Sequence, residues 1–206
     1  MIIDCHTHDP HRADAIISVA PTDFRPKERL TYSVGIHPWS TDQSTDFSIL
    51  AQAASHPAVI AIGETGIDRL RGADTETQKK IFRRHILLSE QLHKPLILHV
   101  VKAVDEILAI RKAMNPRMPW IWHGFRGNAQ MARQLTGKGI YLSLGEHFNP
   151  KAAEAIDSAM LLLESDESML SIREIAERVA ASRGESADEV MLTATRNLQR
   201  ATAYTV

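Results

Sequence analysis

Two histidines near the start of the sequence, His6 and His8, could bind a metal ion together. Side chains two residues apart on a strand point to the same side, so a strand here would present both imidazoles to one site. Neutral imidazole is a common metal ligand. Because a His-x-His pair also occurs often by chance, its meaning depends on where the other candidate ligands fall in the chain.

The other candidate ligands share the position of this pair, at or just after the C-terminal end of an apolar run. The full set is His6, His8, Glu64, His99, His123 and Asp166. Eight such runs alternate largely with helical patterns, at residues 1–8, 15–20, 31–36, 58–64, 95–99, 120–123, 140–144 and 160–166. This order predicts an α/β fold, a (β/α)8 TIM barrel, whose catalytic side chains gather at the C-terminal rim of the strands.

The predicted barrel is compact because its first two connections are short. Residues 7–14 and 21–30 contain prolines and lack room for a proper helix, so the helices after strands 1 and 2 are expected to be reduced or missing. Outward-facing side chains such as Cys5, Ile17 and Val19 would then face water unless something covers them. We expect the closing helices to cover the first strand, and a second subunit in a homodimer could cover the second.

Polar residues mark where several helices begin. The segment Thr75-Glu76-Thr77-Gln78 matches a capping box, and Ser171 and Ser186 begin two closing helices, each with a glutamate three residues later. On the helix after Thr75, we expect His85 and His93 to lie at the surface or in a groove.

Composition restricts the class of protein. With 206 residues and 44% hydrophobic content the chain suits one domain, residues 1–206, with a sizeable core. The 24 Lys+Arg and 25 Asp+Glu give a net charge of -1, so the basic excess of a duplex-coating protein is absent. The single cysteine excludes an internal disulfide, and no apolar run suits a signal peptide or a membrane span. We therefore expect a cytoplasmic protein without membrane contact.

Taken together and in order, the motifs resemble the TatD family of metal-dependent hydrolases, within the amidohydrolase-like TIM barrels. The resemblance covers nearly the whole chain and rests on residues 4–8, 35–38, 61–68, 95–99, 123–127 and 163–166. It implies two divalent metal ions with Glu64 bridging them. One ion would lie on His6, His8 and Asp166, and the other on His99 and His123. The resemblance also implies hydrolysis of DNA phosphodiesters, because family members are generally described as deoxyribonucleases.

Other residues have expected roles around this centre. His37 and Arg126 are candidate contacts for a substrate phosphate, against the alternatives of a turn histidine and a solvated arginine. Asp68 and Asp4 are candidates to hold the metal ligands through hydrogen bonds, although Asp4 could equally be tied to backbone near the barrel floor. Trp39 could stack on a base or pack over the barrel mouth.

The expected chemistry is hydrolysis by a metal-activated water. Asp166 suits a dual role as ligand and proton acceptor, and Glu64 fixes the separation of the two ions, so both are predicted to be catalytic. Mixed imidazole and carboxylate sites accept Zn²⁺, Mg²⁺ or Mn²⁺.

Two departures from the family pattern concern the substrate. Val101 stands where the family usually has an arginine, and the loop after Asp166 is short. We therefore expect a deoxyribonuclease that trims single-stranded or short DNA ends. The alternatives are an amidohydrolase-type enzyme acting on a small phosphoester, lactone or amide, and a metal-binding protein without catalysis.

Overall fold

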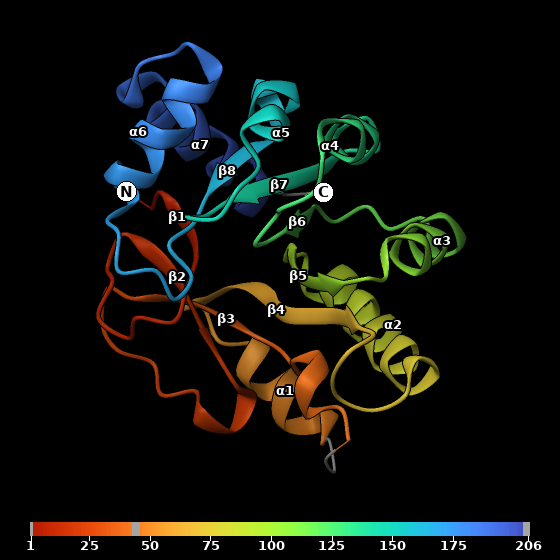
Figure 1. Cartoon of the computed structure of the whole chain (residues 1–206). Helices are drawn as coiled ribbons and strands as arrows, with labels where there is room; N and C mark the ends of the chain where they lie inside the picture. Colours follow the sequence, from red (N-terminus) through yellow and green to blue (C-terminus); the bar gives the residue numbers. More distant parts are fainter. Residues whose placement is uncertain (1, 43–45, 204–206) are drawn as a thin grey trace.

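The protein is a closed barrel of parallel strands, as the sequence predicted (Figure 1). The computed structural model describes residues 2–42 and 46–203. Its strands are β1 (Asp4–Thr7), β2 (Ala15–Val19), β3 (Thr31–Val34), β4 (Val59–Asp68), β5 (Leu96–Val101), β6 (Trp120–Trp122), β7 (Ile140–Leu144) and β8 (Leu161–Leu163). The barrel closes where Asp4 of β1 pairs with Ala15 of β2 on one side and with Leu163 of β8 on the other. Met1, which began the first predicted strand, lies outside the described residues.

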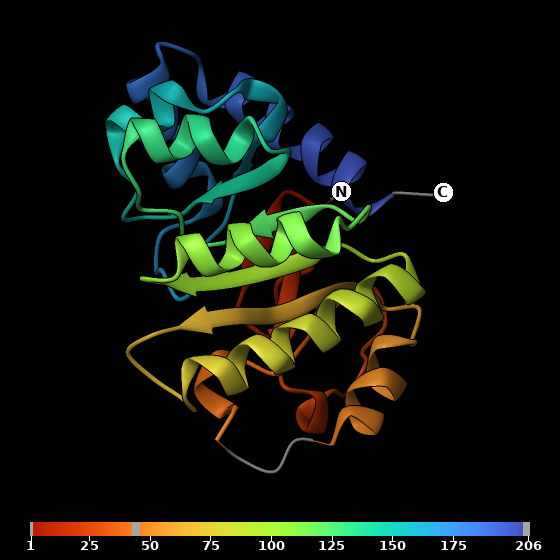
Figure 2. The same ribbon diagram turned by 90° about the vertical axis from the view of Figure 1, so that its right-hand side faces the viewer.

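Helices cover most of the outer face of the barrel. They are α1 (Phe47–Ala54), α2 (Thr75–Leu92), α3 (Val104–Met114), α4 (Ala129–Thr136), α5 (Pro150–Ala155), α6 (Ile172–Arg183) and α7 (Ala187–Thr202), with short 3-10 helices η1 (Pro21–Asp23), η2 (Pro38–Ser40) and η3 (Ser158–Met160). Figure 2 shows α2 and α3 running along β4 and β5. Within residues 2–42 and 46–203, no helix has the length and apolar content that a membrane crossing requires.

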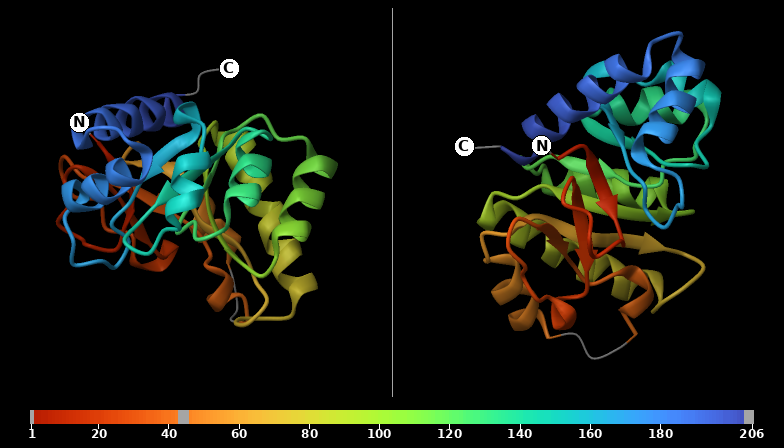
Figure 3. Two further views of the ribbon diagram at one scale, coloured as in Figure 1. Left: turned by 45° about the horizontal axis from the view of Figure 1, so that its top comes forward. Right: turned by 90° about the vertical axis from the view of Figure 1, so that its left-hand side faces the viewer.

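The connections after β1 and β2 contain no α-helix, which confirms the prediction, and the right-hand view of Figure 3 shows loops on this side. Cys5 and Ile17, for which a cover was expected, are 0% and 1% exposed. Ile17 belongs to the main apolar cluster, against which Phe24 and Leu30 of the β2–β3 connection pack. The chain itself therefore covers the outer side of β2, and Val19 is half-buried.

Cys5 is buried because it points into the barrel. The pairing of β1 with β2 shifts register between Asp4 and Thr7, so the strict alternation assumed from the sequence breaks there. The thiol of Cys5 donates to Oγ of Ser143 at 3.0 Å. Its apolar neighbours come from the other strands and from α7: Ile16, Ala61, Ile97, Ile121, Leu162, Leu198 and Ala201. The closing helices α6 and α7 contact β8, the strand that pairs with β1.

Two of the predicted capping boxes are present and one is not. Ser171 and Ser186 cap α6 and α7 as predicted. For α2 the predicted box is wrong, because Asp74 is the N-cap and its carboxylate accepts the N–H of Thr77. Aspartate is a strong N-cap, so the helix is capped one residue earlier and Gln78 is free for another role.

The two histidines of the α2 region differ in exposure. His93, the C-cap, is exposed as expected. The expectation for His85 is wrong, because it is 0% exposed and both ring nitrogens are bonded. Its Nδ1 lies 2.9 Å from the carbonyl oxygen of Ile81, and its Nε2 accepts the N–H of Ile36 at 3.0 Å. Burial lowers the pKa of His85 to about 4, so the ring is neutral at neutral pH.

Candidate metal centre

Glu64 lies at the centre of a cluster of histidines, and its two carboxylate oxygens face different imidazoles. Oε1 lies 3.5 Å from Nε2 of His6 and 3.3 Å from Nε2 of His8. Oε2 lies 2.8 Å from Nε2 of His123 and 3.6 Å from Nδ1 of His99. One carboxylate therefore reaches two separate groups of nitrogen ligands, which is the arrangement that a bridging ligand requires.

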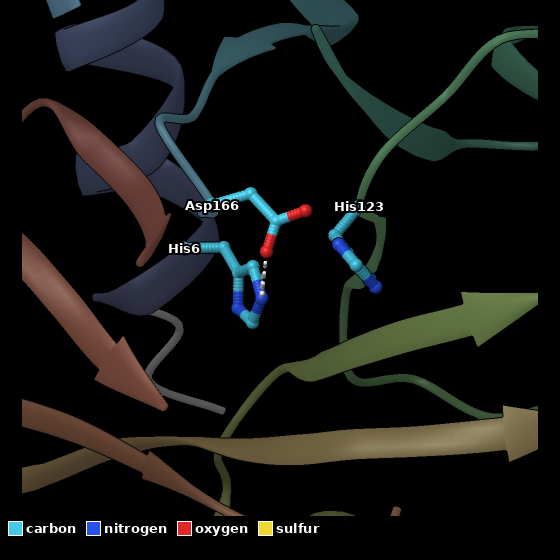
Figure 4. A group of neighbouring side chains, drawn as sticks. All are labelled: His6, His123 and Asp166. Carbon is cyan, nitrogen blue, oxygen red and sulfur yellow. Dashed lines mark ion pairs between the residues drawn. The ribbon is translucent and has the colours of Figure 1, made fainter. Parts of the chain in front are cut away.

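Asp166 completes the first group. Its Oδ1 lies 3.5 Å from Nε2 of His6 and 3.6 Å from Nε2 of His8, and Figure 4 shows it directed at His6 with His123 nearby. Backbone pairing holds it there, because the N–H of Asp166 donates to the carbonyl of His6 at 3.0 Å and the N–H of His8 donates to the carbonyl of Asp166 at 3.2 Å. We call His6, His8, Asp166 and Oε1 of Glu64 the first ligand set. His99, His123 and Oε2 of Glu64 form the second ligand set.

The donor atoms fit divalent cations. Both ring nitrogens of His6 are buried and have no hydrogen-bond partner among the described residues, although Nε2 faces two carboxylates. A buried polar atom without a partner costs free energy, and coordination to a cation would satisfy Nε2. Three triads have ligand atoms within 4.8 Å of one another: His6, His123 and Asp166; His6, His8 and Glu64; and His37, Glu64 and His99. Imidazole nitrogen with carboxylate oxygen suits zinc and other first-row divalent ions.

The charge balance keeps Glu64 ionised. Burial raises the pKa of Glu64, but the neighbouring His6 and His123 outweigh burial and hold its pKa well below the ordinary value. The hydrogen bond to Glu64 in turn raises the pKa of His8. Ser18, which the sequence analysis did not single out, donates its hydroxyl to Oε1 of Glu64 at 3.3 Å. A lone serine on a strand gives no signal in the sequence for this contact.

Asp68, a candidate from the sequence for holding a metal ligand, lies next to His99. Its Oδ2 lies 3.4 Å from Nε2 of His99 and accepts the indole N–H of Trp39 at 2.6 Å. With Nε2 occupied by this carboxylate, Nδ1 of His99 is left for the second ligand set. A carboxylate behind a metal-binding histidine fixes the tautomer and the orientation of the ring.

Glu164 lies behind His123 and was missed as a site residue. Its Oε1 is 3.8 Å from Nδ1 of His123 and accepts the N–H of Gly124. Burial lowers the pKa of His123, but Glu64 and Glu164 together raise it well above the ordinary value. The sequence contained a usable signal, because Glu164 precedes Asp166 by two residues at the end of an apolar run.

His37 faces the same oxygen as the second ligand set, with Nε2 3.5 Å from Oε2 of Glu64. Its Nδ1 accepts the backbone N–H of Trp39 at 3.1 Å, so a neutral ring carries its proton on Nε2. A protonated Nε2 cannot coordinate a cation, but it can donate a hydrogen bond to a phosphate oxygen. This geometry fits the expected substrate contact better than a metal ligand.

A cavity of about 480 Å³ opens beside the ligands. Its polar lining residues include His8, His37, Glu64, His99, His123 and Asp166, and its apolar lining residues include Val19, Pro21, Ile36, Trp39 and Ile49. Trp39 and Ile49 are 45% and 39% exposed. The guanidinium of Arg71 lies 4.3 Å from the centre of the Trp39 ring system, so one face of the indole is already covered. The cavity suits a ligand with an anionic group and a flat apolar group.

Two expected site residues lie away from the ligand atoms. Oδ1 of Asp4 accepts the backbone N–H of His6 at 3.2 Å, and Oδ2 accepts the hydroxyl of Ser165 at 2.6 Å. Asp4 therefore holds backbone and not an imidazole, which was the alternative reading of this residue. Arg126 is exposed and lines a smaller cavity of about 260 Å³, which meets the main cavity at Asp166.

Comparisons with known proteins show which family and fold this chain resembles. The family model described as TatD related DNase matches residues 5–202. A curated relative named "Uncharacterized metal-dependent hydrolase YcfH", from Escherichia coli (strain K12), is 27% identical over 196 residues, which are 84% of this chain and 74% of the relative. A 3'-5' ssDNA/RNA exonuclease TatD from Klebsiella pneumoniae (strain 342) is 30% identical over 169 residues, covering 75% of this chain and 64% of the relative. The crystal structure of YJJV, a TatD homologue from Escherichia coli K12, has the same fold, with a TM-score of 0.84 at 21% identity over 99% of this chain and 98% of that chain.

Proposed function

Because this chain belongs to the family of TatD-related DNases and is thus a metal-dependent hydrolase, we propose that it trims the ends of single-stranded or short DNA. The name of the Klebsiella pneumoniae relative, a 3'-5' ssDNA/RNA exonuclease, supports this choice of substrate. The reaction proposed is hydrolysis of a terminal phosphodiester by a water molecule.

The observation that carries the proposal is the division of the Glu64 carboxylate between two ligand sets. In this proposal the first ligand set holds one divalent ion and the second ligand set holds another. Two such ions supply Lewis-acid stabilisation of phosphate charge and lower the pKa of a water molecule. Glu64 fixes the separation of the two sets, and Asp68 and Glu164 fix the rings of His99 and His123 from behind.

Asp166 is the proton acceptor in this proposal. Its side chain is 30% exposed and lines the cavity, so it reaches the side from which a substrate enters. Burial raises the pKa of Asp166, but the imidazole of His6 that faces its carboxylate outweighs burial and lowers the pKa below the ordinary value. The carboxylate is therefore ionised at neutral pH and can take a proton from the attacking water.

Different lining residues contact different parts of the substrate in this proposal. His37 donates from Nε2 to a phosphate oxygen, next to Glu64. The base of the terminal nucleotide lies against Trp39 and Ile49. Stacking on an aromatic ring tolerates any base, so we expect little sequence preference.

The charge around the cavity favours binding of a DNA end over binding of a long duplex. Duplex binding needs several contacts from cations to phosphates. The cavity is lined instead by Asp46 and Glu167 in addition to the ligands, and Arg126 lies in the adjoining smaller cavity. Few cations are thus available to follow a long backbone.

A small phosphoester, lactone or amide is the second candidate substrate, favoured by the apolar side chains in the lining of the cavity and by the net charge of -1. One panel separates the two functions: end-labelled single-stranded DNA, blunt duplex, nitrophenyl phosphate diesters and nitrophenyl esters, each with Mg²⁺, Mn²⁺ or Zn²⁺. We expect stepwise shortening of the single strand. Rapid turnover of the small esters with intact DNA would favour the second candidate. A Glu64→Gln preparation purified in parallel controls for a contaminating nuclease.

A further inference from the structure

Two loops outside the ligand sets shape the wall of the cavity. The first loop, residues 35–41, contributes Gly35, Ile36, His37, Trp39 and Ser40 to the cavity lining, whereas the second loop, residues 68–73, contributes no residue to it among those described. The loops are tied together by the indole N–H of Trp39, which donates to Asp68, and by the N–H of Ala73, which donates to Oγ1 of Thr41 at 3.1 Å. Any movement of one loop would therefore move the other.

The two loops also approach each other closely at the backbone. A Cβ atom built on Gly72 would lie 2.0 Å from the carbonyl oxygen of Pro38, and the φ of Gly72 is +79°. Only glycine fits this approach without displacing one loop. The two loops thus form one packed wall. Contacts with other parts of the protein must hold this wall in place.

Gln78 of α2 holds the second loop. Its Oε1 accepts the N–H of Asp68 at 2.8 Å. Its Nε2 lies 2.9 Å from the carbonyl oxygen of Asp68 and 2.8 Å from those of Arg71 and Ala73. Gln78 is 1% exposed, so these contacts are shielded from water.

His85 of α2 holds the first loop. Its Nε2 accepts the N–H of Ile36, the residue before His37, and its Nδ1–H donates to Ile81 of its own helix. Phe47 packs edge-on against the His85 ring, with ring centres 5.3 Å apart. The imidazole therefore joins α2 to the end of β3.

His85 is seven positions after Gln78, which is close to two helical turns, so both side chains project from the same face of α2. We propose that these two side chains are positioning residues that set the wall, and through Asp68 the His99 ring, relative to Glu64. The inference rests on the proposed two-metal function, because the position of the wall matters only if the second ligand set binds a metal ion. Apolar side chains would pack at both positions, but they would leave the N–H of Ile36 and the Asp68 backbone groups unpaired.

The test compares disruptive and conservative variants of each position. His85→Leu removes both hydrogen bonds, whereas His85→Gln can still donate to Ile81 and accept from Ile36. Gln78→Met keeps the length of the side chain and removes its polar atoms, and Gln78→Glu keeps only the acceptor. Leu87→Ala, on the exposed face of the same helix at 61% exposure, is the matched control.

Two readouts do not require turnover. Mn²⁺ binding to the metal-free protein is followed by calorimetry and fitted to two sites. Acrylamide quenching reports on Trp39, because Trp120 and Trp122 are 0% and 5% exposed. Cleavage of single-stranded DNA is then measured as kcat and KM.

For His85→Leu and Gln78→Met we expect about a 10- to 100-fold loss of Mn²⁺ affinity at one site only, the range seen when the partner behind a ligand is removed. Trp39 quenching should increase, KM and kcat should both worsen, and His85→Gln should recover most of the wild-type values. Leu87→Ala should match the wild type in every readout.

The opposite pattern overturns the inference: folded His85→Leu and Gln78→Met variants with wild-type affinity at both sites and unchanged Trp39 quenching. If His85→Leu does not fold, His85→Asn, which is too short to reach both partners, is judged by the same criteria. Wild-type protein that binds two Mn²⁺ ions without cleaving DNA would refute the proposed function, while the binding and quenching results would still decide the positioning role.

Discussion

The Oε2 atom of Glu64 lies 2.8 Å from the Nε2 atom of His123. The other oxygen of the same carboxylate faces His6 and His8, which come from the first strand and the loop after it. A carboxylate divided in this way couples the two ligand sets, so changes at Glu64 should differ from changes at any histidine.

Glu64→Ala should lower metal content at both ligand sets, because it removes one donor atom from each. His99→Ala should lower it mainly at the second ligand set. Elemental analysis of the purified variants, after dialysis against a fixed Zn²⁺ concentration, gives ions bound per chain. Full occupancy in Glu64→Ala would remove the bridging role, and His99→Ala serves as the matched single-set comparison.

Asp166→Asn should keep much of the metal and lose about 10²- to 10⁴-fold in kcat, the usual contribution of general acid–base catalysis. An amide oxygen still coordinates a cation, but an amide does not accept the proton of the attacking water. Metal content and kcat are measured on the same preparation. Near-normal turnover with full metal content would restrict Asp166 to the role of a ligand.

Most of the fold and of the ligand cluster could be predicted from the sequence. The alternation of apolar runs with helical patterns identified the barrel. Because barrel enzymes carry their catalytic side chains at the C-terminal ends of the strands, the six candidate ligands were then expected to lie together. Residues such as His99 and His123 are single polar side chains at the ends of apolar strands. Their positions in the sequence therefore strongly indicate a place at the rim of the barrel. The outcome for Cys5 differed because a register shift in β1 broke the alternation.

The supporting residues could not be predicted in the same way. In the sequence, Gln78 matched a capping box and His85 looked like an ordinary helix histidine. Their hydrogen-bond partners are backbone groups in loops, 10 residues away from Gln78 and 49 residues away from His85. Tertiary hydrogen bonds to backbone leave no pattern in the local sequence. Glu164 is the exception, since its spacing from Asp166 would have placed it near the site.

Trp39→Ala should raise KM for single-stranded DNA by about 5- to 150-fold, corresponding to roughly 1–3 kcal/mol for one stacked base. Trp39→Phe keeps an aromatic face but loses the hydrogen bond to Asp68. If the base stacks on Trp39, the phenylalanine variant should recover most of the KM. Equal KM values for all three proteins would exclude base stacking at this position.

Folding stability should depend on the protonation of His85. Burial lowers its folded pKa to about 4 from an ordinary 6.5, so between these pH values the unfolded chain binds a proton that the folded chain does not. The contribution is full above pH 6.5 and is lost as the pH falls towards 4, on the order of 3 kcal/mol in the free energy of unfolding.

Comparison with His85→Gln isolates this contribution, because glutamine does not titrate. Burial also raises the pKa of Asp4 to about 6 from 3.8, which stabilises the fold as the pH falls and opposes the effect of His85. Urea unfolding with EDTA at pH 7 and pH 4.5 should show the wild type losing more stability than the variant. Equal losses would mean that His85 is not held neutral in the fold.

The protein should shorten single-stranded DNA from an end and leave a blunt duplex and supercoiled plasmid largely intact. The main cavity has room for a terminal nucleotide, and its lining, within the part of the chain that the structure describes, includes Asp46 and Glu167 but no lysine or arginine. Binding that releases few counterions depends only weakly on salt concentration. The logarithm of the affinity for a single strand should therefore fall with a shallow slope between 50 and 200 mM salt, about −0.7 per phosphate contacted. Labelled strands resolved by gel and affinities from fluorescence anisotropy measure both effects, with Arg126→Ala as a test of the one arginine in the adjoining cavity. Efficient nicking of plasmid together with a steep salt slope would require a duplex-binding surface, and the proposed substrate would then be wrong.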